Sequence, residues 1–288
     1  MKICGISDIH GDLNINIPEC DVLCICGDVI NLNDQRDIPA SKKWWETRFV
    51  EWVKSLPCSK VIITPGNHDF FLERMYTECW GWFKDRMRLL SDKKLEFLID
   101  ESFYYEDIHF YGTPWIKPIE FQEGRWAFEH PEGDKYYIQI PICDVLITHD
   151  NPYKNNKLNV CCWWKSECHL FGHWHNGEDD SLRSKFNCSI LDDMYNRKKK
   201  FKCVIIDIMT EAQKKQIEQD FLKELLIQVK CDPLFTLPSS NIIHEHNKKI
   251  IALLESFKDE DGPVLEDTIP WKHPMENVDS AIITDFND

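Results

Sequence analysis

Basic side chains are scarce in this sequence: 34 lysines and arginines stand against 49 acidic residues, and the formal net charge is −15. Proteins that bind nucleic acid regardless of its sequence gain most of their affinity from basic side chains that neutralise phosphates. The composition therefore disfavours nucleic acid as the main partner, while leaving room for a local basic groove.

Long apolar runs are also missing, since no uninterrupted apolar stretch approaches the roughly 20 residues that a membrane helix needs. We therefore expect no membrane partner. No leader-like segment precedes Lys2, and the first chemically suggestive residue is already Asp8, so we expect the N-terminus to belong to the fold.

Signs of a disulfide framework are lacking, although the chain has 13 cysteines. The chain is long, the cysteine count is odd, and Cys24 and Cys26 lie in an apolar, strand-like run. We interpret the thiols as reduced and the protein as cytoplasmic.

One cysteine-rich run invites comparison with a zinc site. It contains Cys161, Cys162, Cys168 and His169. Its spacing does not match the usual paired C-x(2–4)-C pattern, so buried and incidental thiols are the favoured interpretation.

What the sequence does contain is a regular alternation of short apolar runs with helical patterns. The apolar runs indicate buried strands at 2–7, 21–26, 60–64, 142–148 and 201–208. Helices are predicted over 42–56, with Ser41 as N-cap and Pro57 as the stop, and over roughly 70–100. The alternation predicts an α/β fold with helices covering a sheet.

The pattern changes after residue 208, where amphipathic helices are predicted over 211–230 and 241–257, followed by an acidic tail from Asp259. We therefore divide the chain into a main domain, 1–208, and an appendage, 209–288. The apolar stripes of the appendage either pack on the main domain, which is favoured, or form an oligomer contact. They comprise Ile217, Phe221, Leu225, Ile250, Leu253 and Leu254.

Five polar motifs follow the predicted strands, at positions where loops gather functional side chains. They are Asp8-Ile9-His10, Gly27-Asp28, Gly66-Asn67-His68-Asp69, Thr148-His149 and Gly172-His173-Trp174-His175. Each is weak alone, because an isolated Asp-x-His or strand-end histidine is common. Five in this order are hard to reconcile with coincidence.

This ordered set resembles the signature of the calcineurin-like metallophosphoesterase superfamily over residues 1–208. The resemblance implies a sandwich of two mixed β-sheets flanked by helices, with two divalent metals at one edge. By motif match the first metal would be held by Asp8, His10, Asp28 and His175. The second would be held by Asp28, Asn67, His149 and His173.

Mixed nitrogen and oxygen ligands suit Mn, Fe, Zn, Ni or Co, and we favour Mn. Asp28 would bridge the two metals, and a metal-held hydroxide would attack the phosphoester. The resemblance makes His68 the non-ligand histidine that protonates the leaving oxygen. Asn67, His68 and Trp174 are the candidate substrate contacts.

Two departures bear on the substrate. Protein Ser/Thr phosphatases of the superfamily continue the Gly-Asp motif with an Asp and an Arg, where this chain has Asn31 and Leu32, so a phosphoprotein substrate is disfavoured. Residues 112–115, Gly-Thr-Pro-Trp, resemble an element of small members related to cyclic-nucleotide phosphodiesterases. That subgroup has Gly-Pro-Pro where this chain has Asp150-Asn151-Pro152. Asp150 either orients a ligand histidine, reshapes the substrate side or is a surface residue.

Several tryptophans could stack a nucleobase if they border the site, with Trp174 favoured because it lies between two candidate ligands. The others are Trp115, Trp126, Trp163 and Trp164. The basic run 197–200 either attracts phosphate or, more in keeping with its surroundings, forms a solvated hairpin tip.

The leading hypothesis is thus a phosphodiesterase for a small phosphate ester such as a cyclic nucleotide. A nuclease of the same superfamily is the alternative within the enzyme class. From another class, the chain could be a non-catalytic metal-binding scaffold that recruits partners through 209–288.

Overall fold

The computed structural model describes residues 1–130, 134–176, 184–198 and 203–231. The chain divides into two compact units, Met1–Glu211 and Ala212–Asp288, and each is considered by itself. The candidate ligands all lie in the first unit.

The first sheet contains five strands in the order β10-β1-β2-β3-β4. Their bounds are β1 (Lys2–Ile6), β2 (Val22–Cys26), β3 (Lys60–Thr64), β4 (Leu95–Phe97) and β10 (Val204–Asp207). Strands β1 to β4 are parallel, and β10 runs antiparallel to β1. All five residues of β2 are buried, as expected for a central parallel strand covered on both faces.

The second sheet has the order β5-β6-β7-β8-β9. Its strands are β5 (Glu101–Tyr105), β6 (Ile108–Thr113), β7 (Cys143–Thr148), β8 (Ser166–Phe171) and β9 (Lys185–Asn187). Strands β6 to β9 are parallel, and β5 runs antiparallel to β6. The two sheets are therefore both mixed, as the family resemblance implied.

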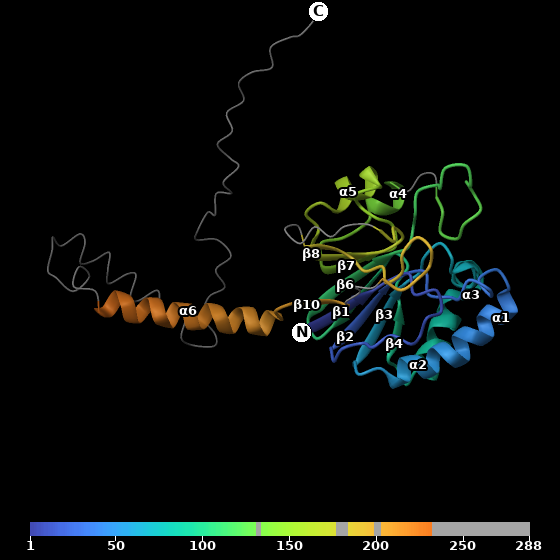
Figure 1. The fold of residues 1–288 in the computed structure, drawn as a ribbon. Coiled ribbons are helices and arrows are strands. Elements are labelled where there is room, and N and C mark those ends of the chain that lie inside the picture. The colour runs from blue at the N-terminus through green and yellow to red at the C-terminus, as the bar shows by residue number, and fades with distance from the viewer. Residues whose placement is uncertain (131–133, 177–183, 199–202, 232–288) are drawn as a thin grey trace, which may run out of the picture. The chain divides into compact units, whose positions relative to one another are not determined.

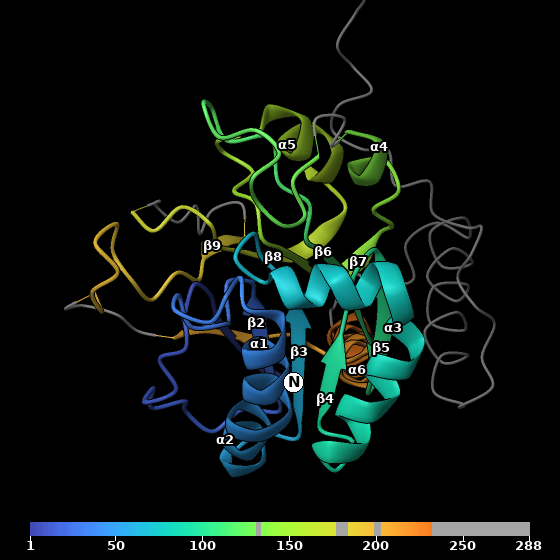
Figure 2. The ribbon, with the colours of Figure 1, turned by 90° about the vertical axis from the view of Figure 1, so that its right-hand side faces the viewer.

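The sheets face each other across an apolar layer. Ile3, Val22 and Ile62 of the first sheet share this layer with Val145 and Leu170 of the second. Helices cover the outer faces, with α1, α2 and α3 over the first sheet and α4 and α5 over the second (Figures 1 and 2). Their bounds are α1 (Ile38–Trp44), α2 (Val50–Ser55), α3 (Phe70–Leu90), α4 (Asp134–Tyr137) and α5 (Asn156–Cys162). The expected α/β sandwich is confirmed.

The helix predicted over 42–56 begins earlier than expected. Its N-cap is Asp37, whose carboxylate accepts a hydrogen bond from the Ala40 amide at 3.0 Å, so the choice of Ser41 was wrong. Pro39 fits within the first turn because amides there have no intrahelical acceptor. A π-helical segment, Trp45–Phe49, joins α1 to α2, which ends at Ser55 because Leu56, before Pro57, is extended.

The helix predicted over roughly 70–100 was too long. Helix α3 ends at Leu90, and Asp92 and Lys93 turn the chain with left-handed backbone angles. Residues 95–97 then pair with β3 as an additional strand. Short strands of this kind are stabilised by pairing with a partner distant in sequence, which local periodicity does not reveal.

In the second unit, helix α6 spans Glu211–Cys231, close to the helix predicted over 211–230. The predicted helix over 241–257, its apolar stripe and the acidic tail lie outside the described residues. The proposed packing or oligomer role of 209–288 stays a prediction. Among the described residues, no helix is long and apolar enough to span a membrane.

Candidate metal centre

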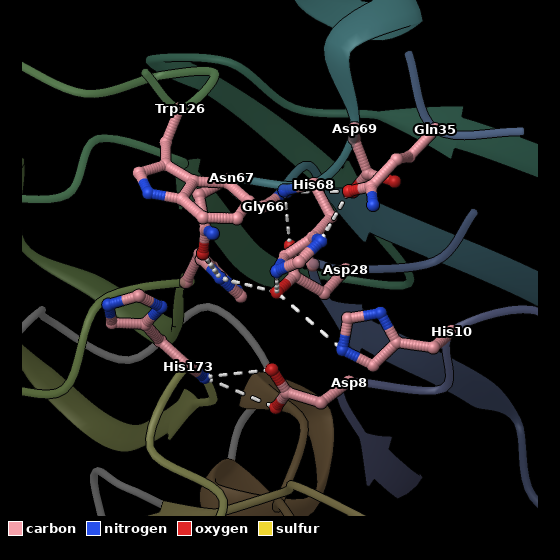
Figure 3. Close-up of polar contacts among 12 residues, drawn as sticks. Asp8, His10, Asp28, Gln35, Gly66, Asn67, His68, Asp69, Trp126 and His173 are labelled. Carbon is pink, nitrogen blue, oxygen red and sulfur yellow. Dashed lines mark hydrogen bonds and ion pairs between the residues drawn. The ribbon is translucent and has the colours of Figure 1, made fainter. Parts of the chain in front are cut away.

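The seven residues expected to bind metal come together at the carboxyl ends of β1, β2, β3, β7 and β8. Figure 3 shows five of them, Asp8, His10, Asp28, Asn67 and His173. Three groups of closely spaced donor atoms form there. One comprises Asp8, His10 and His175, a second comprises Asp28, His149 and His173, and a third comprises His10, Asp28 and His68. The first two groups correspond to the two expected ligand sets, with Asn67 beside the second.

Asp28 lies between His10 of the first group and His149 of the second. Its Oδ2 atom is 3.9 Å from Nε2 of His10 and 3.4 Å from Nε2 of His149. Its Oδ1 atom accepts a hydrogen bond from the His68 amide at 2.8 Å. Burial by itself would raise the pKa of Asp28, but the neighbouring histidines, His149 first, hold it well below the usual range. The position and ionised state of Asp28 suit a bridging carboxylate.

The chain turns sharply where it delivers these side chains. The backbone is left-handed at four candidate ligands, with φ of 54° at Asp8, 42° at His10, 53° at Asp28 and 67° at His173. This conformation is uncommon for residues other than glycine and costs free energy. The surrounding hydrogen bonds sustain it and aim the side chains inward.

Asp8 is fixed from the last motif as well as from its own strand. Both of its carboxylate oxygens accept hydrogen bonds from the His173 amide, and Ser189 Oγ donates to Oδ2. Nε2 of His175 lies 3.5 Å from Oδ1. Burial would raise the pKa of Asp8, but the contact with His175 and the charge of His149 outweigh it and lower this pKa to about 2. Ser189 belongs to none of the sequence motifs and was missed.

Two of the histidines have their tautomers set by backbone carbonyls. Nδ1 of His149 lies 2.7 Å from the Cys26 carbonyl, and Nδ1 of His175 lies 2.8 Å from the Asp192 carbonyl. A carbonyl accepts only, so Nδ1 carries a proton and Nε2 is the nitrogen left to face the centre. This arrangement is typical of histidines that bind metal.

The arrangement of the donor atoms is favourable with a bound cation and unfavourable without one. Nε2 of His149 faces two oxygen acceptors, Asn67 Oδ1 at 2.8 Å and Asp28 Oδ2 at 3.4 Å. Lone pairs converge there unless a proton or metal lies among them, and Asp28 accordingly raises the pKa of His149 to about 10 against the effect of burial.

The environment of His10 also fits a bound cation. Within the described residues, neither of its buried ring nitrogens has a hydrogen-bond partner. Burial lowers its pKa to about 4, so the imidazole is neutral and its lone pair is available. An unpaired buried nitrogen is costly unless a ligand satisfies it. The residues present therefore fit divalent metal ions.

Asp69, the last residue of the Gly-Asn-His-Asp motif, supports the centre from behind. Its buried carboxylate accepts hydrogen bonds from the amides of Val29, Ile30 and Gly66, at 3.1, 3.1 and 2.8 Å. It thus joins the loop that carries Asp28 to the loop that carries Asn67 (Figure 3). In the sequence, its position at the end of the Gly-Asn-His-Asp motif was the feature that could have identified Asp69.

His68 projects toward the centre without joining either expected ligand set. Its Nδ1 atom lies 2.6 Å from Oε1 of Gln35, which makes Nδ1 the protonated nitrogen. Its Nε2 atom is 3.8 Å from Oδ2 of Asp28, and its ring packs on Trp126 with centroids 4.7 Å apart. Burial lowers its pKa, although Asp28 opposes the shift. Nothing in the local sequence identified Gln35.

The tryptophans differ in position. Trp174 lines a cavity of about 330 Å³ together with His173 and His175. Trp126 lies against His68, while Trp115 is buried and donates its indole N–H to Asp100. Trp163 and Trp164 are exposed and line no part of that cavity. A larger hollow of about 540 Å³ is lined by residues such as Cys20 and Cys58 and contains none of the seven ligands.

Asp150 lies at the cavity that Trp174 lines. It is buried, and its Oδ2 atom accepts hydrogen bonds from the Lys117 amide at 3.1 Å and from Nδ2 of Asn155 at 2.8 Å. It also lines the 330 Å³ cavity. Of the interpretations left open, shaping the substrate side agrees best with these contacts.

The cysteine-rich run does not form a metal site among the described residues. Nε2 of His169 lies 2.8 Å from Thr148 Oγ1, and its Nδ1 atom lies 3.7 Å from Cys162 Sγ. Burial lowers the pKa of His169 to about 3. It is a neutral, structural histidine, and the described cysteines are all free thiols.

Within the basic run 197–200, Arg197 is engaged by the carboxylate of Asp12, with its Nε atom 3.1 Å from Oδ2. Lys198 donates to the Ser189 carbonyl at 2.8 Å. Arg197 thus attaches the 189–198 loop to the loop after β1, whereas Lys198 joins the two ends of the 189–198 loop. Residues 199 and 200 lie outside the described residues.

Comparison with known proteins agrees with this geometry. Residues 1–205 match the family model described as calcineurin-like phosphoesterase. A curated relative from Emericella nidulans, named probable rhamnogalacturonate lyase C, is 26% identical over 196 residues, covering 62% of this chain. The match spans only 17% of that protein's length. The family model covers more than half of the chain, and the chain therefore belongs to the calcineurin-like phosphoesterase family, whose domain carries out metal-dependent hydrolysis of phosphoesters.

Proposed function

We propose that this protein is a phosphodiesterase that hydrolyses a small phosphate ester, such as a nucleotide diester, at two divalent metals. The position of Asp28 between two histidine-rich donor groups is the observation that carries the proposal. One metal would be held by Asp8, His10, Asp28 and His175, and the other by Asp28, Asn67, His149 and His173. Mn is the favoured metal.

Bound divalent metals would polarise the phosphoryl group and lower the pKa of water. The chain's own groups then have separate tasks. Asn67 lies beside His149 at the phosphoryl side, where its amide can hold a phosphate oxygen. Nε2 of His68 points to the same place, while Gln35 fixes the ring through Nδ1. His68 would donate a proton from Nε2 to the leaving oxygen in its imidazolium form, in which both ring nitrogens are protonated, and would return to the neutral ring with Nδ1–H still held by Gln35.

The surroundings of the second motif support a small ester over a phosphoprotein. Asn31, at the position where protein phosphatases carry an Asp, is used in a local turn. Its Nδ2 atom donates to Asp34 at 2.9 Å, and its Oδ1 atom accepts from the Asp34 amide at 3.0 Å. No guanidinium is available at Leu32 to hold a phosphoprotein phosphate.

The Gly-Thr-Pro-Trp element gives further support. Thr113 Oγ1 and Trp115 Nε1 both donate to the carboxylate of Asp100, at 2.7 and 2.6 Å. These bonds fix the end of β6, from which residues 117–120 continue into the wall of the 330 Å³ cavity. The element therefore has a structural role beside the proposed substrate site.

The proposal is tested with bis(p-nitrophenyl) phosphate and p-nitrophenyl phosphate, each assayed with Mn, Fe, Zn, Ni and Co. We expect turnover with faster cleavage of the diester. Asp28→Asn should reduce turnover at least about 100-fold, because the bridging ligand is lost. Asp85→Asn is the matched control, since the side chain of Asp85 is 79% exposed on α3.

Three results would contradict the proposal. The first is no turnover with any of these metals once metal content has been verified, and the second is full turnover in Asp28→Asn. Preference for the monoester would reject the diesterase assignment alone. Efficient digestion of an oligonucleotide with poor cleavage of both small esters would favour the nuclease alternative.

A further inference from the structure

The 330 Å³ cavity beside the metal centre is formed by four loops, which follow β6, β7, β8 and β9. Its lining consists of Lys117, Pro118, Ile119, Glu120, Asp150, Asn151, Lys154, His173, Trp174, His175 and Asp193. Candidate ligands to both metals, His173 and His175, share its wall. An ester held at the metals would therefore extend one of its substituents into this cavity.

Trp174 supplies an aromatic face within the cavity. The Nζ atom of Lys154 lies 3.5 Å from the centroid of the indole ring, a cation–π contact. The backbone beneath the ring is fixed, because Asn187 Nδ2 donates to the Trp174 carbonyl at 2.8 Å and the Trp174 amide donates to Gly172 at 2.8 Å. The ring thus stands on a fixed backbone and is covered by a long, flexible and replaceable side chain.

The opposite loop is fixed as well. Asp150 accepts a hydrogen bond from the Lys117 amide, and its Oδ1 atom accepts one from the Asn151 amide at 2.7 Å. Asn151 in turn accepts from the Tyr153 amide at 2.8 Å. These bonds preform the wall that carries Pro118 and Ile119, so the ligand does not have to order it.

The chemistry of the lining selects a class of ligand. Apolar surface comes from Trp174, Pro118 and Ile119, donors from Lys117 and Lys154, and acceptors from Glu120 and Asp193. A flat ring with both donors and acceptors on its edge satisfies all three kinds of group. A purely aliphatic substituent would leave the polar groups unsatisfied, and a second phosphate would meet three acids, Glu120, Asp150 and Asp193.

Resting on the proposed function, we propose that this cavity binds the nucleobase of a nucleotide ester, stacked on Trp174. The base replaces the Lys154 ammonium on the indole face, and Lys154 becomes a donor to the edge of the base. Trp126 is not the platform, because its ring already packs on His68 and does not line this cavity. Base stacking on an aromatic side chain is worth about 1–3 kcal/mol.

Equilibrium binding to the metal-loaded protein tests this without relying on turnover. Adenosine 5′-monophosphate and ribose 5-phosphate share the phosphate and sugar but differ in the base. We expect the wild type to bind adenosine 5′-monophosphate at least 5-fold more tightly. Trp174→Ala should reduce that ratio about 5- to 100-fold, and Trp174→Phe should retain most of it.

Two further variants serve as a control and as an independent test. Trp164→Ala removes an exposed tryptophan outside the cavity and should leave the ratio unchanged. Ile119→Arg fills part of the cavity from another of its lining residues and should therefore reduce the ratio. Its added charge acts on both phosphates alike and cancels in the ratio. If Trp174→Ala loses its metals or fails to fold, the ratio measured for Ile119→Arg tests the inference instead.

A kinetic comparison separates failure of this inference from failure of the proposed function. Thymidine 5′-p-nitrophenyl phosphate and methyl p-nitrophenyl phosphate share the leaving group. Trp174→Ala should raise KM only for the thymidine ester. If neither ester is cleaved, the proposed function fails and the binding ratio still decides the inference. Equal ratios in wild type and both cavity variants, or equal KM changes for both esters, would overturn the inference alone.

Discussion

The backbone amide of His173 donates hydrogen bonds to both carboxylate oxygens of Asp8, each at 3.2 Å. The two residues are 165 positions apart, and the contact joins the loop after β8 to the loop after β1. It lets the main chain of one candidate ligand orient the side chain of another. The close approach depends on Gly172, the residue that precedes His173.

Gly172→Ala should disturb the metal centre through this contact. A Cβ atom at position 172 would lie 1.9 Å from Ser7 Oγ and 2.7 Å from Asp8 Oδ2. We expect a loss of about 1–3 kcal/mol in the free energy of unfolding, as for other overpacked sites, and about 10- to 100-fold weaker metal binding. Urea unfolding and a metal titration measure these two quantities.

Gly81→Ala is the matched control, because a Cβ atom there would have no neighbour within 4 Å. It lies in α3 and should leave metal affinity unchanged, with unfolding free energy unchanged or higher by up to about 1 kcal/mol. Adding Ser7→Gly to Gly172→Ala removes the nearest clash and should restore part of the loss. Equal effects of the two alanine substitutions would refute the steric explanation.

His68→Ala should reduce kcat by about 10²- to 10⁴-fold on a diester with an alkoxide leaving group, because the proton donor is lost. The loss should be smaller for a p-nitrophenolate leaving group, which departs without protonation. Metal content should stay unchanged. Turnover of both substrates and metal analysis of the purified variant provide the measurements.

His109→Gln is the control for His68, since His109 lies on β6 and contacts Ser102. His68 belongs to a third close group with His10 and Asp28, which leaves a ligand role to be excluded. Loss of a metal in His68→Ala would assign it as a ligand. A loss of kcat independent of the leaving group would remove its role as acid.

Divalent metal should stabilise the fold by binding the folded state. At a free metal concentration about 100 times Kd, the expected gain is about 2.7 kcal/mol, reduced by any binding of metal to unfolded cysteines and histidines. Asp28→Asn should lose most of the gain, whereas Asp85→Asn should keep it. Unfolding free energies with chelator and with excess Mn test this, and an equal gain in both variants would argue against binding at Asp28.

His169 should make stability depend on pH. Burial lowers its pKa to about 3 in the folded state, whereas the unfolded value is about 6.5. The unfolded chain therefore takes up the proton first, so the contribution is intact above pH 6.5 and is lost as the pH falls toward 3. Between pH 7 and 5.5 the expected loss is about 1.3 kcal/mol.

The measurement compares urea unfolding of the wild type with that of His169→Gln at these two pH values. The glutamine amide can still donate to Thr148 but does not titrate. The other histidines contribute to both proteins and cancel in the difference. An identical pH dependence in the two proteins would show that His169 titrates normally in the folded state.

Much of the first unit followed from the sequence, because buried parallel strands are continuous apolar runs whose bounds local composition reveals. Val22–Cys26 and Lys60–Thr64 were located within a residue. Leu95–Phe97 and Lys185–Asn187 were missed, since three-residue edge strands have no period of their own. The N-cap at Asp37 was missed because Ser41, four residues later, is also a preferred N-cap residue type.

For the site, the sequence alone determined the kinds of donor atom and their order along the chain, since each motif directly follows a strand. Only the tertiary structure decided how these donors share space: Asp28 lies between His10 and His149, the ring nitrogens of His10 lack a hydrogen-bond partner among the described residues, and His149 and His175 present Nε2. It also contributed Ser189, Gln35 and the cavity at Trp174. The reason is physical: strand and turn preferences act over a few residues, whereas hydrogen bonds and cavities join loops more than a hundred residues apart.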